Sequence, residues 1–531
     1  MRFSSYGWAF ALVSAACVLI SGVPLITVAV ELIGESSALS GLGDRQIALL
    51  LNSLRIAGGA AVVSMVLGGA LGVALQMLRV PSRTLLLWLL PVPFLIPPYI
   101  QTLAWMEILG KGGILAGVLE SLFDVRAAVP NLYSPGGAVW VLALAHYPIV
   151  AATTLLGVRG LDARYEEAAV LARGPRAVLL RIQGPLLAPA ILTGGLIVFL
   201  LTLVTFSVPS MLQQSVYPVE IHTQFAAFYD TGAGLWGAMP LVAVGGAAAL
   251  AWLMYVRRRR GWYSGHARPA QCTRGTRPVR IGAAAMSWGL VSVSTLLPLS
   301  VLAWRSLPVS SYAQAWDTAH QELASSVAIA SASACIITGL GFLLAYFSRL
   351  RVATAAVCGT TLTPMLMSGP ALGIALILAW NHAGWRGAVY DSVAIVVLAS
   401  CARYLFFGFA AAAVAARRLD PELFEAASVS GASWYRQAGS VLLPLSLPTL
   451  AGVWGLSFVL CFGEVDAAVL LTPPGSTTLP VRIFGLLHYG PSSLVAALSL
   501  LVVFVQIGGA GLAFAAYALS KRFVYARHTL R

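Results

Sequence analysis

Long apolar stretches, separated by short polar segments, recur along this whole chain. A helix needs about 20 apolar residues to cross the hydrocarbon core of a bilayer, and these stretches reach that length. Twelve of them are present, at residues 8–30, 47–77, 85–109, 138–158, 186–210, 236–256, 283–305, 322–346, 354–380, 392–415, 447–471 and 495–519. The pattern predicts an all-α polytopic membrane protein with about twelve transmembrane helices.

Composition and charge support the same class. Hydrophobic residues make up 59% of the 531 residues and charged residues only 10%, too few to cover a soluble protein of this length. Most of the 33 Lys and Arg residues fall in alternate loops and at the two ends, as the positive-inside rule requires of a chain that starts in the cytoplasm. The net charge of +14 therefore reflects topology, and we expect both termini in the cytoplasm, the lipid bilayer as the surroundings, and no nucleic-acid partner.

The N-terminal apolar segment and the six cysteines both have structural interpretations. The apolar N-terminal segment through Val30 is longer than the core of a signal peptide, and the topology needs it, so we expect a retained first span. The six cysteines show no metal-ligand spacing, and five lie in apolar spans, where we expect small core residues. The sequence leaves any metal site unknown.

Two polar segments in matching positions have similar sequences, LDARYEEAAVLARGPRAVLLRIQGP at 161–185 and LDPELFEAASVSGASWYRQAGSVLLP at 419–444. Other segments also match, such as Asn52–Ala57 with Ser325–Ala330, 273 positions later. Tandem repeats of six spans keep the same orientation, so they are related by an axis along the membrane normal. We therefore expect two six-helix halves and an Arg-rich cytoplasmic linker between them, at 1–256, 281–531 and 257–280. The spacing also predicts a longer external loop at 110–137 in the first half.

The second copy carries a pattern made by Glu425, Ala426, Ala427, Gly431 and Pro444. This pattern resembles the EAA loop of permease subunits of binding-protein-dependent (type I) ABC importers, and two copies in one chain resemble the fused-dimer branch with two MetI-like halves. The resemblance implies a helix-turn-helix that docks into a cytoplasmic ABC ATPase homodimer. It also implies a periplasmic or extracellular solute-binding protein as partner and a place in the bacterial cytoplasmic (inner) membrane.

The residues of the second loop favour a rigid elbow, meaning two short helices joined by a fixed turn. Asp420 followed by Pro421 is typical of a helix start, and Gly431 can adopt the positive φ that ends a helix. Ser433 can cap the helix that follows.

The first loop departs from the motif and allows two registers. Aligning Pro185 with Pro444 makes Glu166 the motif glutamate and places Ala172 at the glycine position. Aligning the Leu-Asp pairs instead makes Glu167, Ala168 and Ala169 the motif, with Gly174 and Pro175 supplying the break. Both glutamates remain candidates for coupling to the ATPase.

The chain lacks the motifs of an ATPase or a hydrolase. Its two lysines, Lys111 and Lys521, are followed by glycine and arginine, so neither belongs to a Gly-Lys-Ser/Thr phosphate loop. The HExxH, GxSxG and CxxC patterns do not occur. We expect a transport component and not an enzyme, with no cofactor bound by this chain and with ATP used by the partner ATPase.

We expect charged side chains within spans to face protein or water and not lipid, because a charge near the bilayer centre costs roughly 2.5–3.5 kcal/mol on insertion scales. Glu464 and Asp466 are two apart, about 200° around a helix, so both cannot face one pore. They either pair with Arg403 or Arg55 at a helix interface, or lie along the substrate path. Glu107 is a further charge of this kind.

Prolines interrupt two spans in corresponding positions. They are Pro91, Pro93, Pro97 and Pro98 in the third span, and Pro364 and Pro370 in its repeat partner. Paired interruptions indicate a translocation path in transporters, although interfacial kinks are the alternative. We select Pro97, Pro98, Pro370, Glu464 and Asp466 as candidate pathway residues.

The expected solute comes from resemblance. The segments 96–105, 220–230 and 471–490 are most similar to the fused ferric-iron permeases, which implies ferric iron; thiamine, phosphonate and polyamine permeases share the architecture and stay as alternatives. Hard Fe³⁺ prefers oxygen ligands, and external Tyr217, Glu220, Tyr229 and Asp230 are either such ligands or ordinary loop residues. In type I importers the external segments at 217–230 and 477–489 would face the binding protein.

A twelve-helix secondary transporter driven by an ion gradient is the alternative of another class. It would explain the repeat and the intramembrane acids, but not two EAA-like loops.

Overall fold

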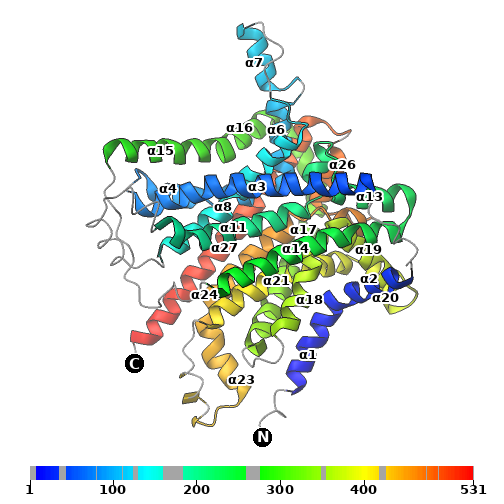
Figure 1. Ribbon diagram of the computed structural model, residues 1–531, viewed down its shortest axis with the longest axis vertical. Helices are drawn as coiled ribbons and strands as arrows, with labels where there is room; N and C mark the ends of the chain where they lie inside the picture. The colour runs from blue at the N-terminus through cyan, green and yellow to red at the C-terminus, as the bar shows by residue number, and fades with distance from the viewer. Residues whose placement is uncertain are drawn as a thin grey trace. The chain divides into compact units, whose positions relative to one another are not determined.

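The computed structural model consists of helices joined by short connections (Figure 1). It describes the chain except residues 1–6, 35–42, 79, 111, 124–129, 160–182, 259–275, 349–353, 418–421, 423–425, 428, 474, 488 and 530–531. Eleven helices in the described part are long and apolar enough to cross a membrane, and a bent helix pair brings the number to twelve. The predicted all-α class with about twelve spans is confirmed.

The chain divides into two compact units. The first span of each predicted half belongs to the unit that contains most of the other half. Unit 1 comprises Met1–Leu39, Ile221–Ala238 and Pro308–Arg531, and unit 2 comprises Ser40–Glu220 and Met239–Leu307. The first span therefore packs with helices of the second predicted half, and the span before Leu307 packs with helices of the first. The boundaries of the two halves stay a prediction about the sequence repeat.

Unit 2 is built around a close crossing of two long helices. Gly68 and Gly72 of one helix lie against the backbone of the other, and a Cβ on Gly68 would come within 2.4 Å of the Tyr147 carbonyl oxygen. Small residues let helix backbones approach in this way within membranes. The helices are α3 (Asp44–Met77), α4 (Arg83–Leu89), α5 (Val92–Leu95), α6 (Pro98–Leu109), α7 (Ile114–Phe123), α8 (Pro135–Arg159), α11 (Gly184–Leu203), α12 (Ser207–Met211), α15 (Arg277–Val291) and α16 (Leu297–Arg305).

Unit 1 repeats this packing device. A Cβ on Gly341 would lie 2.6 Å from the carbonyl carbon of Gly408 on the facing helix. The helices are α1 (Gly7–Cys17), α2 (Val23–Gly34), α17 (Ser310–Ser348), α18 (Thr354–Leu366), α19 (Gly369–Trp380), α20 (Trp385–Tyr390), α21 (Ala394–Arg417), α23 (Trp434–Gln437), α24 (Leu443–Phe462), α25 (Ala468–Leu471), α26 (Leu479–Leu486) and α27 (Ser492–Thr529). Two further helices, α13 (Tyr217–Phe228) and α14 (Thr231–Arg258), contribute to both units.

Short π-helical turns mark the first spans of both halves. They lie at Val18–Gly22 and Ser292–Leu296, each two residues before a proline, Pro24 or Pro298. Proline has no N–H to donate, so the carbonyl one turn back needs another partner, which a wider turn supplies. The two turns are repeat partners, 274 positions apart.

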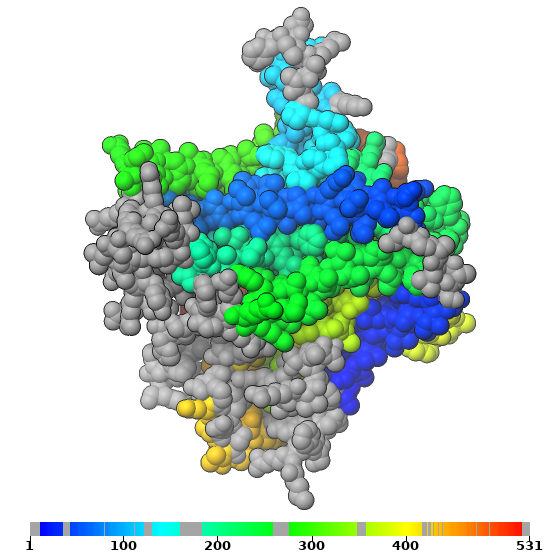
Figure 2. Space-filling view, in the orientation of Figure 1, coloured from blue at the N-terminus to red at the C-terminus, as the bar shows by residue number. Residues whose placement is uncertain are grey.

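Apolar side chains face outward along the spans, as a lipid environment requires. Figure 2 shows α3 as a band exposed along one side, where Val62 and Val66 are 54% and 64% exposed. The predicted longer loop of the first half contains α7, whose ten residues exceed the six of α20 in the second half.

Candidate functional site

The second EAA-like loop contains the predicted turn at Gly431. Its φ is +74°, and the N–H of Ala432 donates to the carbonyl of Ala427 at 3.1 Å, while that of Ser430 donates to Ala426 at 3.0 Å. A left-handed glycine with this bond pattern is the Schellman ending of a helix. The expected positive φ of Gly431 is confirmed, and its role in coupling stays a prediction.

The rest of the loop leads directly into a span. Helix α23 begins after Ser433, whose carbonyl accepts the N–H of Gln437 at 2.9 Å, and Pro444 is the second residue of α24. Pro185 has the same place in α11. Two apolar side chains of the loop are largely exposed, Val429 at 90% and Tyr435 at 67%. The other coupling candidates, Glu166, Glu167, Ala168, Gly174 and Glu425, lie outside the described residues.

The proline-containing spans are interrupted in both halves. In unit 1, α18 and α19 meet at an angle of 112°, and Pro370 is the second residue of α19. In unit 2, Pro97 precedes α6 and Pro98 begins it. The buried Gln101 side chain donates to the Pro93 carbonyl at 2.8 Å, which satisfies an oxygen that the broken helix leaves free. The predicted interruptions are confirmed, and their place on a translocation path stays a prediction.

A buried ion cluster lies beside the interruption in unit 1. Nε of Arg403 on α21 is 3.3 Å from Oε2 of Glu464, and its Nη2 is 3.3 Å from Oδ2 of Asp466. The hydroxyl of Tyr404 donates to Glu464, and Oε1 of Glu464 accepts the Ala467 N–H at 2.9 Å. All three charged side chains are less than 10% exposed.

The expectation that the two acids point apart is wrong. It assumed one continuous helix through Glu464 and Asp466, but α24 ends at Phe462 and both acids lie in the short break before α25. A non-helical backbone lets both carboxylates reach the same guanidinium. Of the two alternatives, the ion pair with Arg403 is present, while a place on the substrate path stays a prediction.

Glycine brings the ion cluster against the start of α19. A Cβ on Gly369 would come within 2.3 Å of the Cβ of Asp466, so no larger residue fits there without a shift. The N-terminal end of a helix carries partial positive charge. The start of α19 therefore adds to the stabilisation that Arg403 gives to Asp466.

The equivalent positions in unit 2 hold no arginine or acid. The repeat aligns Arg403 and Tyr404 with Ala145 and His146, and the two acids with Thr205 and Ser207. His146 Nδ1 lies 2.9 Å from the Leu142 carbonyl, and the Thr205 hydroxyl donates to Leu201 at 2.7 Å. Helices α6, α8 and α12 contact one another there, as α19, α21 and α25 do in unit 1.

A second pair of equivalent regions joins a short helix to a long one. In unit 2 the Ser53 hydroxyl of α3 accepts the backbone N–H of Tyr217 at 3.0 Å. In unit 1 the Ser326 hydroxyl of α17 accepts the N–H of Leu479 at 2.8 Å. The loose sequence match between the segments 217–230 and 477–489 therefore corresponds to one local structure at their starts.

An ion pair reinforces each of these joints, with opposite polarity. Arg45 of α3 pairs with Glu220 at 2.9 Å, whereas Glu322 of α17 pairs with Arg482. Glu220 is thus held by an arginine, and another candidate iron ligand, Asp230, accepts the N–H of Ala233 at 2.8 Å. Within the described ranges no group of three or more His, Cys, Asp and Glu side chains is placed to hold a metal ion.

Sequence reasoning missed Tyr404 and the paired serines. Tyr404 directly follows an arginine within a span, and Ser53 and Ser326 fall in the best-matched segment of the repeat. Those signals mark the residues only once the hydrogen-bond partners, far away in sequence, are known.

The comparisons with known proteins agree with this architecture. Residues 337–523 match the family described as "Binding-protein-dependent transport system inner membrane component". The matched part of the chain includes the second EAA-like loop and the ion cluster.

Two relatives carry the name of one solute. The chain is 31% identical over 145 residues to a protein of Salmonella paratyphi A named as a 2-aminoethylphosphonate transport system permease, PhnV, covering 27% of this chain and 54% of the relative. It is 30% identical over 166 residues to the similarly named PhnU of Salmonella choleraesuis, covering 31% of this chain and 58% of the relative. The chain thus matches little more than half the length of these curated relatives.

Proposed function

We propose that this chain is the permease subunit of a type I ABC importer of the inner membrane, with both halves of the translocation path in one polypeptide. A soluble binding protein delivers the solute, and a separate ATPase dimer supplies the energy. The observation that carries the proposal is the family match over residues 337–523, which contains a loop with the EAA signature and the Gly431 turn.

The loop has the properties that an ATPase-docking element needs. The left-handed Gly431 fixes the angle between two short helices, so motion of a partner is transmitted to α24 and not absorbed. Val429 and Tyr435 expose apolar surface on the same loop, and exposed apolar residues of this kind are typical of a docking surface. An ion-gradient transporter has no need for such an element.

The solute that the comparisons favour is an organophosphonate of the 2-aminoethylphosphonate type. Relatives with two different names, PhnU and PhnV, carry this solute in their names. The phosphonate alternative from the sequence is therefore better supported than ferric iron.

Uptake in cells tests the proposal. We would express the chain with the ATPase and binding protein encoded beside it and follow radiolabelled 2-aminoethylphosphonate, with ferric iron as a parallel substrate. We expect uptake of the phosphonate that stops when the phosphate-loop lysine of the ATPase is replaced. Uptake driven by an ion gradient without the ATPase would contradict the importer, and iron uptake alone would contradict the choice of solute.

A further inference from the structure

In unit 2, the first span of the second half runs beside an interrupted span, and both are irregular at the same level. Helix α15 packs on α4, the π-turn at Ser292–Leu296 packs on α5, and α16 packs on α6 (Figure 1). The interruption lies between α5 and α6. The π-turn of one span therefore lies beside the break of the other.

Unit 1 repeats this arrangement with the first span of the chain. The π-turn at Val18–Gly22 packs on α18 and α21, and α2 packs mainly along α19. Helices α18 and α19 are the pair that meets at 112°. The thiol of Cys17, the last residue before the turn, lies 3.9 Å from the Thr360 hydroxyl of α18. The part of the span before the turn thus lies against α18, and the part after it lies against α19.

An ion pair ties the second part of the span to the interrupted span in unit 2. Nη2 of Arg305, the last residue of α16, is 2.6 Å from Oε2 of Glu107 on α6. The two side chains are 35% and 21% exposed, and ion pairs removed from water in this way are costly to separate. A displacement of α6 relative to α5 would carry α16 with it. The first span would then have to bend between α15 and α16, where its π-turn lies.

Both π-turns contain a buried hydroxyl without a partner. Ser21 and Thr295 are repeat partners, 274 positions apart, and they are 0% and 2% exposed. Neither hydroxyl has a hydrogen-bond partner among the residues that the structure describes. Burying an unpaired hydroxyl costs free energy, and both halves have this cost in the same turn. The last carbonyls before a helix break lack partners within their own helix, so a shift at the break can bring an acceptor to each hydroxyl.

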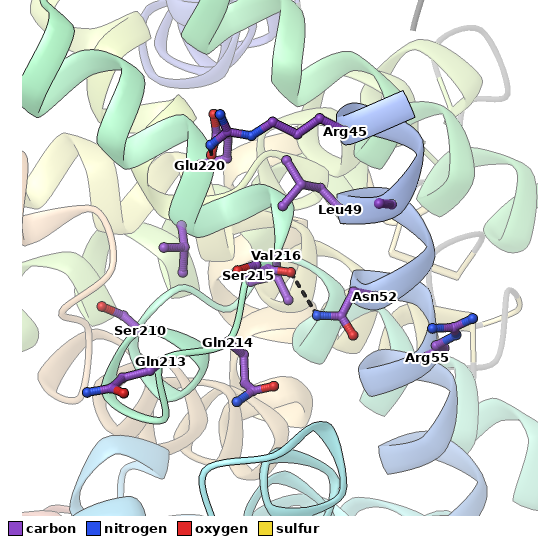
Figure 3. Close-up of a pocket in the computed structure, with 12 residues that line it drawn as sticks. Arg45, Leu49, Asn52, Arg55, Ser210, Gln213, Gln214, Ser215, Val216 and Glu220 are labelled. Atoms are coloured by element: carbon purple, nitrogen blue, oxygen red, sulfur yellow. Dashed lines mark hydrogen bonds and ion pairs between the residues drawn. The ribbon is translucent and has the colours of Figure 1, made fainter. Parts of the chain in front are cut away.

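Other polar groups of unit 2 have their partners in this state. The hydroxyl of Ser294, next to Thr295, lies 3.0 Å from the Tyr147 hydroxyl, and both residues are fully buried. At the pocket beside the start of α3, the Asn52 amide donates to the Ser215 carbonyl at 2.7 Å (Figure 3). These bonds stabilise the present state, so their residues serve as controls for the two unpaired hydroxyls.

We propose that the two π-turns are hinges, at which the second part of each first span moves together with the second part of the interrupted span beside it. The hydroxyls of Ser21 and Thr295 are positioning groups that gain a carbonyl partner in the moved state and stabilise it. This inference rests on the proposed function, because the path of an importer has to open to each side of the membrane in turn. Hinges in such transitions are a few residues at the ends of helical elements, and π-turns are frequent at functional sites.

Removing each hydroxyl tests the hinge. Ser21→Ala and Thr295→Val should reduce ATP-dependent uptake of 2-aminoethylphosphonate about three- to tenfold, the effect of one lost hydrogen bond in the moved state. The same variants should leave the midpoint of thermal unfolding unchanged or raise it, because no described residue pairs with these hydroxyls in the present state. Ser21→Thr and Thr295→Ser keep a hydroxyl and should keep uptake.

Matched controls lie in the same unit. Ser287→Ala removes a hydroxyl of the same span that donates to the Ala283 carbonyl of its own helix at 2.7 Å, so uptake should not change. Ser294→Ala leaves the buried Tyr147 hydroxyl without its partner and should lower the midpoint of unfolding. Asn52→Ala should lower it as well, because it removes a bond that is present in this state.

A crosslink tests whether α16 and α6 move together. In the double variant Glu107→Cys with Arg305→Cys, a short bifunctional thiol reagent should join the two helices. We expect the joined chain to transport as fast as the same chain before crosslinking. Each single variant, treated with the same reagent, is the control.

Three results would overturn the hinge: a lowered midpoint for Ser21→Ala and Thr295→Val, uptake by these variants equal to that of the unchanged chain, or a crosslink that stops uptake. The unchanged chain separates the two proposals. If it shows no ATP-dependent uptake, the importer is contradicted, and the midpoints still decide whether the hydroxyls have partners in this state. If it transports and the hydroxyl variants transport equally well, the hinge alone is contradicted.

Discussion

The N-terminal part of α3 in unit 2 and the corresponding part of α17 in unit 1 share one frame but differ in chemistry. In both, a serine hydroxyl accepts the backbone N–H at the start of a short helix, and an ion pair reinforces the joint. The polarity of that ion pair is reversed, because the arginine lies on the long helix in unit 2 (Arg45) and on the short helix in unit 1 (Arg482). The hydrogen-bonded frame has been kept in both halves, while the side chains around it have diverged.

The interrupted spans also differ in charge. The helices α19, α21 and α25 enclose Arg403 with two carboxylates, whereas the equivalent positions beside α6, α8 and α12 are Ala145, His146, Thr205 and Ser207, with no arginine or acid among them. The two units therefore differ in charge at this place, which one chain allows because its two units need not have the same side chains.

The largest expected effect comes from breaking the ion cluster in unit 1. Arg403→Met leaves Glu464 and Asp466 buried without a counter-charge, which should cost about 3–5 kcal/mol of folding free energy. Thermal unfolding in detergent would show a strongly lowered midpoint, and adding Glu464→Gln and Asp466→Asn should recover most of it. The exposed Arg386→Met is the control, and an unchanged midpoint for Arg403→Met would show that the cluster contributes nothing.

Replacing Gly431 should uncouple transport from ATP hydrolysis. A valine at φ +74° is strained by roughly 1–2 kcal/mol, enough to shift a two-state equilibrium about 5–30-fold. We expect uptake to fall by that order while membrane insertion stays normal. Gly452→Val is the control, because this helical glycine also has open space around it. Equal uptake by both variants would mean that the elbow geometry is irrelevant.

The two EAA-like loops should differ in tolerance. The second has its glutamate, alanines, glycine and proline in place, whereas the first has a shifted register, so Glu425→Ala should reduce uptake more than Glu166→Ala or Glu167→Ala. Cysteines at Ala427 and Ala169 should each crosslink to the ATPase. If Glu425→Ala reduced uptake no more than the first-loop variants did, at matched expression, the predicted difference between the two loops would be wrong.

The smallest effects should come from the ion pairs at the two joints. Glu220 pairs with an arginine that is 77% exposed, and Glu322 with one that is 32% exposed. Exposed pairs contribute at most about 1 kcal/mol, so Glu322→Gln should destabilise slightly more than Glu220→Gln. Unfolding midpoints of the two variants measure this directly, and a larger loss for Glu220→Gln would reverse the ranking.

The local sequence was sufficient to predict the spans, the helix interruptions and the turn at Gly431. The apolar lengths predicted the spans, the prolines predicted the interruptions, and the glycine pattern predicted the left-handed turn at Gly431. Contacts between distant segments could not be predicted in the same way. Where α24 ends decides whether Glu464 and Asp466 face one arginine, and no rule about spacing on a continuous helix contains that information. The repeat likewise does not say which half the first span packs with.

Reconstitution tests the central claim most directly. The purified chain, its ATPase and the binding protein would be placed in proteoliposomes, with labelled 2-aminoethylphosphonate outside and ATP on the side of the ATPase. The account predicts accumulation that requires ATP, the binding protein and an intact Gly431 elbow. Accumulation by the chain without the ATPase, or none with all components present, would contradict it.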